Sequence, residues 1–179
     1  AAAVGADSLV HVLVDGFLDS LQVQSLLSAA ITKFESEVVL CGKQAADTNS
    51  GSTGAGVASL LGFSCVGVVS DISIEGGVFS ATRLGPSGLE KIEASAPCVF
   101  TFDKGETELR RPNVRGIMMA KKKPIETVSS ADLGVDLADS PLRVDFHSSP
   151  PQKPPGQKFE GAESVPLVVE KLRDEANVI

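Results

Sequence analysis

Residues 42–56, which read GKQAADTNSGSTGAG, combine glycine with hydroxyl-bearing side chains in a way that suits binding of an anion. Glycines such as Gly51 and Gly54 let a backbone approach a ligand closely because they carry no Cβ. Hydroxyl donors lie beside them at Ser50, Ser52 and Thr53. An apolar run of helical character follows, and the free N–H groups at a helix N-terminus favour an anion. The run therefore predicts a phosphate-binding turn between a strand and a helix.

Three further side chains in this run could contact a ligand. Asp47 would accept a hydrogen bond from a ribose hydroxyl or a backbone amide, Gln44 would contact a polar edge and Lys43 would supply positive charge. The pattern is neither a G-x-G-x-x-G fingerprint nor a Walker A sequence, since no GK[ST] closes it. On spacing alone, a plain Ser/Gly-rich connection stays open as the alternative.

A second segment, residues 106–126, sets positive charge beside adaptable apolar side chains. Its basic residues are Arg110, Arg111, Arg115, Lys121, Lys122 and Lys123, and its apolar ones include Val114, Ile117, Met118 and Met119. Methionine adapts to irregular surfaces, and a basic rim complements an acidic partner. The composition favours a protein-docking segment over the alternative of a solvated basic face.

The elements that must position these segments follow an α/β pattern. Residues 9–14, 37–41 and 65–69 have the apolar, β-branched character of strands, and residues 21–34 and 53–61 have helical spacing. The first strand, helix and second strand predict a right-handed βαβ unit with parallel strands covered on both faces. The run 42–56 would then lie beyond the carboxyl ends of the strands, where open α/β sheets bind ligands.

Beyond residue 70 the pattern changes. Residues 72–83 and 89–95 predict antiparallel strands with GPSG as a turn, and residues 97–102 a short buried strand. Residues 104–155 are rich in Pro, Ser and charge and predict an extended arm. Such an arm is more natural when it wraps a second protein, and a flexible tail stays open as the alternative. A last helix, residues 164–175, would dock on this chain or a partner through an apolar face of Val165, Val168, Val169 and Leu172.

The predicted fold class is therefore α/β, a mainly parallel sheet with flanking helices, an antiparallel hairpin extension and a long C-terminal arm. We expect three regions: an α/β nucleotide-binding core at residues 1–103, a basic recognition loop at 104–124, and the arm with its helix at 125–179. The start, AAAVGADSLVHV, reads like the middle of an α/β repeat. We therefore expect a preceding strand and loop to be missing from this chain.

Composition limits the function classes. Of 179 residues, 16 are basic and 23 acidic, and the net charge of -7 argues against a general nucleic-acid binder. Cys41, Cys65 and Cys98 lie in apolar surroundings, which predicts small buried thiols, and with only His11 and His147 beside them we expect no metal site. Residues 57–69 form an apolar run too short and interrupted for a spanning helix, so no membrane insertion is expected.

The run GKQAADTNSGSTG resembles the GKQAIDxDxxQTG-type AMP loop of the electron transfer flavoprotein β subunit. Matching residues are Gly42, Lys43, Gln44, Ala45, Asp47, Thr53 and Gly54. The resemblance implies a cofactor-binding segment made of Ala45, Ala46, Asp47, Thr48, Asn49, Ser50, Gly51, Ser52, Thr53, Gly54, Ala55 and Gly56.

The basic segment resembles the loop by which the same subunit docks acyl-CoA dehydrogenases. Val114 stands where that loop usually has a leucine anchor, Arg115 where it has proline and Met119 where it has lysine. The implied partner-binding residues are Arg110, Val114, Ile117, Met118, Lys121, Lys122 and Lys123. DLGVD at residues 132–136 and PPQ at 150–152 are similar to the family's C-terminal arm.

The resemblance implies an electron carrier rather than an enzyme, with no catalytic residue on this chain. With an α subunit that holds most of the FAD, a β subunit carrying a structural AMP would pass electrons from acyl-CoA and related dehydrogenases to the respiratory chain through a quinone oxidoreductase. The location would be the mitochondrial matrix in a eukaryote or the cytoplasm in a bacterium. Two alternatives stay open: an adenine-nucleotide-binding sensor on the same scaffold, and a bifurcating flavoprotein subunit with FAD on β.

Overall fold

The computed structural model describes residues 1–105, 108–137, 142, 145–153 and 155–179. Two residues of the basic segment, 106 and 107, and seven of the predicted arm, 138–141, 143, 144 and 154, lie outside the described residues. Contacts divide the chain into two compact units, Ala1–Arg143 and Val144–Ile179. The first unit holds both segments singled out above.

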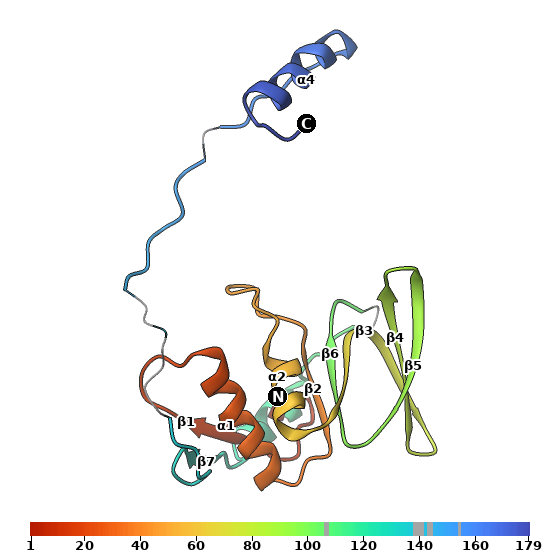
Figure 1. Cartoon of the computed structure of the whole chain (residues 1–179). Coiled ribbons are helices and arrows are strands. Elements are labelled where there is room, and N and C mark those ends of the chain that lie inside the picture. Colours follow the sequence, from red (N-terminus) through yellow and green to blue (C-terminus); the bar gives the residue numbers. More distant parts are fainter. Residues whose placement is uncertain (106–107, 138–141, 143–144, 154) are drawn as a thin grey trace. The chain divides into compact units, whose positions relative to one another are not determined.

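The first unit opens with short elements whose ends are set by local chemistry (Figure 1). A 3-10 turn, η1 (Ala2–Val4), and strand β1 (Val10–Leu13) precede helix α1 (Ser20–Lys33). A capping box starts α1, because Asp19 accepts from the Gln22 N–H and the Gln22 side chain accepts from the Asp19 N–H. Strand β2 (Val38–Gly42) then leads to helix α2 (Thr53–Leu61), which ends at the left-handed Gly62.

The main sheet has five strands in the order β2-β6-β3-β4-β5. It adds β3 (Ser64–Glu75), β4 (Val78–Gly85), β5 (Gly88–Ser95) and β6 (Cys98–Phe102) to β2. Strands β2, β6 and β3 are parallel, whereas β3, β4 and β5 form two antiparallel hairpin pairs. The predicted hairpin extension is confirmed. The sheet has as many antiparallel as parallel strand pairs, whereas a mainly parallel sheet was expected.

Strand β1 does not join this sheet, so the predicted βαβ unit of residues 9–41 is wrong. It pairs in parallel with β7 (Glu126–Ser129), in a separate two-stranded sheet. The inner neighbour of β2 is β6, which comes about 60 residues later in sequence and supplies four buried residues. Strand β2 is an edge strand, and Leu40 on it is 60% exposed instead of covered.

The core of the first unit lies around β6. Cys98, Val99 and Phe100 have no exposed surface, and the Phe100 ring packs 5.4 Å from that of Phe79 between ring centres. Helix α2 covers this sheet through Val57 and Ala58, and α1 lies against α2 (Figure 1). Because β6 lies between β2 and β3, its last residue, Phe102, pairs with Gly42 of β2 and with Val69 of β3.

The predicted arm contains more regular structure than its composition indicated. Residues 114–120 form helix α3 (Val114–Ala120), and β7 pairs with β1. The second unit holds a 3-10 turn, η2 (Ala162–Ser164), and helix α4 (Val165–Asp174), which confirms the predicted last helix. Asparagine capping and strand pairing are specific contacts that composition does not reveal.

The three cysteines are free, but only one of them is fully buried. Cys98 is buried and Cys41 half-buried, whereas Cys65 is exposed at the start of β3, which corrects the expectation of three buried thiols. Burial raises the pKa of the Cys41 thiol. Within the described residues, no helix is long and apolar enough to cross a bilayer, and no group of three His, Cys, Asp or Glu side chains is placed to bind a metal.

Candidate nucleotide loop and docking helix

Among the residues that the structure describes, the first backbone N–H groups of α2 have no acceptor. The first helical hydrogen bond runs from the Gly56 N–H to the Ser52 carbonyl, at 2.9 Å, so the N–H groups of Thr53, Gly54 and Ala55 precede it. Ser52 occupies the N-cap position, but its side chain makes no capping bond. Three donors at a helix N-terminus suit an anion such as a phosphate.

Gly54 lets α2 sit directly on the sheet. A Cβ at this position would lie 2.5 Å from Thr101 Cγ2 and 2.7 Å from Cys41 Sγ. The sequence predicts that this glycine lets a phosphate approach, whereas its immediate neighbours are side chains of β6 and β2. Gly51 has a different role, since its φ of 61° requires the left-handed backbone that glycine adopts without cost.

Lys43 forms an ion pair within the protein. Its Nζ lies 2.9 Å from Asp103 Oδ2, and its backbone N–H donates to the Phe102 carbonyl at 2.7 Å. The Lys43 hydrogen bond, together with one from the Lys104 N–H, lowers the pKa of Asp103. The pair therefore joins the ends of β2 and β6 at the base of the loop.

The rest of the loop bonds to itself. Gln44 Nε2 donates to Asn49 Oδ1 at 3.0 Å, and the Thr48 N–H donates to Asp47 Oδ1 at 2.9 Å. Asn49, at a φ of 52°, donates its own N–H to the Ala45 carbonyl. These side chains are exposed, so a ligand reaches them from solvent.

Gln24 of α1 is a residue that sequence reasoning missed. Its side-chain nitrogen donates to the Ser52 carbonyl at 3.2 Å, although it lies 28 residues earlier in the chain. An amphipathic pattern assigns glutamine to the solvent side of a helix. No local signal pairs Gln24 with the start of α2.

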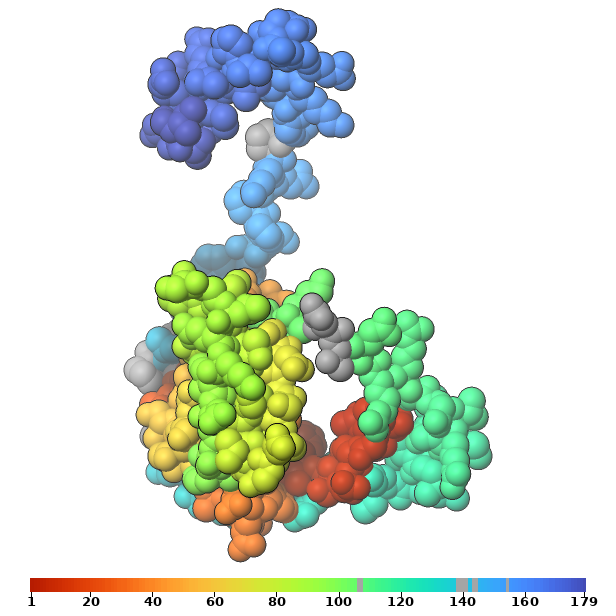
Figure 2. Space-filling view, turned by 90° about the vertical axis from the view of Figure 1, so that its right-hand side faces the viewer, coloured from red at the N-terminus to blue at the C-terminus, as the bar shows by residue number. Residues whose placement is uncertain are grey.

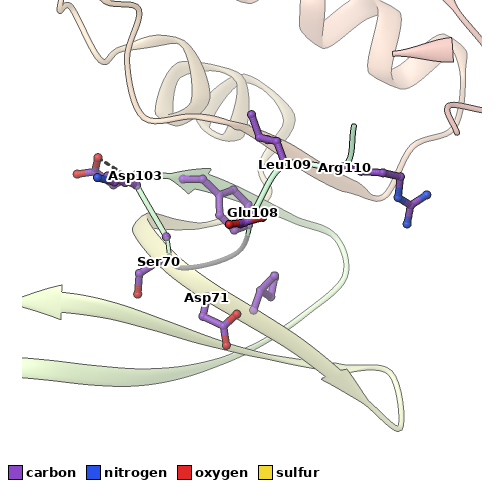
Figure 3. Close-up of a pocket in the computed structure, with 10 residues that line it drawn as sticks. Ser70, Asp71, Asp103, Glu108, Leu109 and Arg110 are labelled. Carbon is purple, nitrogen blue, oxygen red and sulfur yellow. Dashed lines mark hydrogen bonds between the residues drawn. The ribbon is translucent and has the colours of Figure 1, made fainter. Parts of the chain in front are cut away.

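A pocket of about 800 Å³ opens where β6 ends beside the middle of β3 (Figure 3). Ser70 and Asp71 line it from β3, and Glu108, Leu109 and Arg110 line it from the segment that follows the sheet. Asp103 adds a third carboxylate, and no residue of 45–56 contributes to the lining. The lining thus carries three carboxylates beside two basic side chains, Lys104 and Arg110, and the first turn of α2 lies outside it.

The basic segment forms a helix with exposed apolar side chains. Asn113 caps α3 by accepting from the Gly116 N–H at 2.7 Å. Val114 is 75% exposed and Met118 63%, one helical turn apart on the same side. Ile117 is less exposed, and Lys121 and Lys122 lie on the surface just after the helix.

Two of the predicted partner-binding residues hold this segment in place. Arg110 Nη1 donates to the Val4 carbonyl at 3.2 Å, and Lys123 Nζ donates to the Ala6 carbonyl. Residues 108–123 therefore lie beside the N-terminal turn, as Figure 2 shows from the side. Of the seven predicted residues, Lys123 is half-buried, and the exposed ones are Arg110, Val114, Ile117, Met118, Lys121 and Lys122.

Comparison of the sequence with known proteins shows which family the chain resembles. The model of the electron transfer flavoprotein domain matches residues 1–133, which include the loop and α3. The chain is 34% identical to the electron transfer flavoprotein subunit beta of Bradyrhizobium diazoefficiens over 177 residues, covering 99% of this chain and 70% of that one. The Sus scrofa protein of that name is 37% identical, covering 97% and 68%, and the Bacillus subtilis one 32%, covering 100% and 72%.

The chain belongs to the electron transfer flavoprotein family. The predicted resemblance is confirmed, and with it the class of function, electron transport by a flavoprotein. Relatives occur in bacteria and in mammals.

Proposed function

We propose that the chain is the β subunit of an electron transfer flavoprotein. With an α subunit it carries electrons from acyl-CoA and related dehydrogenases to the respiratory chain through a quinone oxidoreductase. The observation that supports this most is that one family match spans the uncapped turn of α2 and the exposed face of α3. The compartment would be the mitochondrial matrix in a eukaryote or the cytoplasm in a bacterium.

The nucleotide of this chain would be AMP, held by residues 45–56. The N–H groups of Thr53, Gly54 and Ala55 would bind the phosphate. Asp47 and Asn49 have exposed side chains in the same loop and would contact the ribose or base. FAD, held mainly by the α subunit, supplies the redox chemistry when bound. The residues of this chain bind and orient, so none of them is assigned as a catalytic acid, base or nucleophile.

The docking of dehydrogenases would rest on α3 and the lysines that follow it. Val114 and Met118 offer adjustable apolar contacts that a partner can bury. Lys121 and Lys122 would complement an acidic rim and speed encounter. Arg110 and Lys123, which bond the carbonyls of Val4 and Ala6, would set the position of this surface instead of contacting the partner.

The second unit would attach the chain to the α subunit. Helix α4 has Val165, Val169 and Leu172 exposed, and an apolar face of this kind needs a partner to cover it. The extended residues before α4 would follow the surface of that partner.

Ligand extraction from the co-purified heterodimer tests this function. AMP together with FAD is the expected result. A second FAD in place of AMP would identify a bifurcating type, and ATP on a chain that forms no complex with an α subunit would identify a nucleotide sensor.

A further inference from the structure

Gln24 is a buried polar side chain that reaches from one helix to the start of the next. It is 9% exposed, and its amide nitrogen lies 3.2 Å from the Ser52 carbonyl oxygen. A carbonyl oxygen only accepts hydrogen bonds, so the nitrogen of the amide must face it. The orientation of the Gln24 side chain is therefore fixed by its partner.

The Ser52 carbonyl is the first acceptor of α2. It receives the Gly56 N–H at 2.9 Å as well as the Gln24 amide. The Ser52 side chain does not cap the helix, in contrast to Asp19 of α1 and Asn113 of α3. The start of α2 is thus held by a donor from another helix instead of by a local cap.

Packing reinforces this hydrogen bond from two sides. A Cβ on Gly56 would overlap the Gln24 amide, so the two residues touch closely. On the other side, Gly54 rests against Thr101 and Cys41. The first turn of α2 is seated between α1 and the sheet, and these contacts determine where its free N–H groups point.

We infer that Gln24 is a positioning residue for the nucleotide-binding turn. This inference rests on the proposed function, in which the first turn of α2 holds the phosphate of AMP. Gln24 does not touch the nucleotide. It acts by fixing the Ser52 carbonyl, and with it the direction of the donors at Thr53, Gly54 and Ala55. An uncapped helix start that loses this bond would fray, and the phosphate would lose its aligned donors.

The test is titration of the purified full chain with AMP, for the wild type, Gln24→Met and Gln24→Glu. Methionine keeps the length of the side chain but cannot donate, so we expect affinity to fall roughly three- to tenfold, the value of one hydrogen bond. Glutamate places a carboxylate against the Ser52 carbonyl oxygen, so a larger loss, about tenfold or more, is expected at neutral pH.

The pH dependence of Gln24→Glu separates positioning from general packing. A protonated carboxyl group donates to the Ser52 carbonyl as the amide does, so affinity relative to the wild type at the same pH should recover between about pH 8 and about pH 5. The matched control is Ser28→Ala, one turn further along the buried face of α1, whose Oγ has no hydrogen-bond partner among the described residues. Its affinity should equal that of the wild type.

The outcomes are distinct. Equal affinity in all variants, or a Gln24→Glu deficit that does not change with pH, would overturn the role of Gln24 while leaving AMP binding intact. An equal loss in Ser28→Ala would also overturn it, since the effect would then belong to the α1 face in general. A wild-type chain that binds no AMP would overturn both this inference and the nucleotide part of the proposed function.

Discussion

Lys43 and Asp103 show how single residues at the base of the loop are used. Sequence reasoning assigned the lysine to a ligand, whereas its ammonium group bonds to the first residue after β6. Both side chains are partly exposed, at 37% and 48%, so solvent weakens their attraction. The pair therefore aligns two strand ends more than it stabilises the fold.

Replacement of Asp103 by asparagine tests this pairing through pH. The pKa of Asp103 is lowered in the folded state, so its contribution to stability is present above the ordinary pKa of an aspartate and is lost as the pH falls through the lowered value. We expect Asp103→Asn to have a slightly lower melting temperature at neutral pH and an unchanged one in acid. A difference that persists undiminished in acid would contradict the ion pair.

Val114 is the residue whose substitution tests the proposed docking surface. Truncation to alanine removes apolar surface from a side chain that is 75% exposed, so the fold should not be affected. We expect Val114→Ala to raise the KM for a reducing dehydrogenase roughly ten- to fifteenfold, since burial of two methyl groups is worth about 1.6 kcal/mol, with nucleotide content unchanged. Leu84→Ala, equally exposed at the β4 end, is the control and should show wild-type kinetics. A loss of nucleotide together with docking would refute the assignment.

At the scale of elements, the seating of α2 on β6 connects packing with the nucleotide turn. Gly54→Ala should lower the free energy of unfolding by about 1–3 kcal/mol, because its Cβ would overlap Thr101 and Cys41. It should release nucleotide at the same time. Gly42→Ala is the matched control in the same loop, since a Cβ there meets no atom within 4 Å. Denaturant unfolding measures the free energy of unfolding of both variants. Equal stability would contradict the packing role of Gly54.

The sequence predicted those elements whose signals are local. The spacing in α1 and α2, the hairpin turns and the apolar run of β6 all specified structure within a few residues. The sheet partners of β1 and β2 were mispredicted because pairing with β7 and β6 joins residues distant in sequence. Helix α3 was missed because a single Asn113 cap outweighs the proline and charge around it.

The same division applies to the candidate site. The loop of residues 45–56 and the exposed face of α3 were predictable from residue types and resemblance, and both stay predictions about ligand and partner. The intramolecular bonds of Lys43, Arg110 and Lys123 were not, because a lysine or arginine side chain carries no sign in the sequence of which carbonyl or carboxylate it reaches.

At the scale of the whole molecule, the two units would have separate tasks. The first unit holds the nucleotide loop and α3, and the second offers the apolar face of α4. We expect Leu172→Asp to weaken association with the α subunit about tenfold or more, because a charge would be buried without a partner. Glu170→Gln on the same helix should have no effect. Co-purification yields measure both, and full complex formation by Leu172→Asp would contradict the attachment through α4.

The most direct measurement of the central claim is native mass spectrometry of this chain co-expressed with an electron transfer flavoprotein α subunit, followed by identification of the released ligands. We expect a heterodimer that releases one FAD and one AMP. A chain that stays alone, or a heterodimer that releases no adenine nucleotide besides FAD, would contradict it.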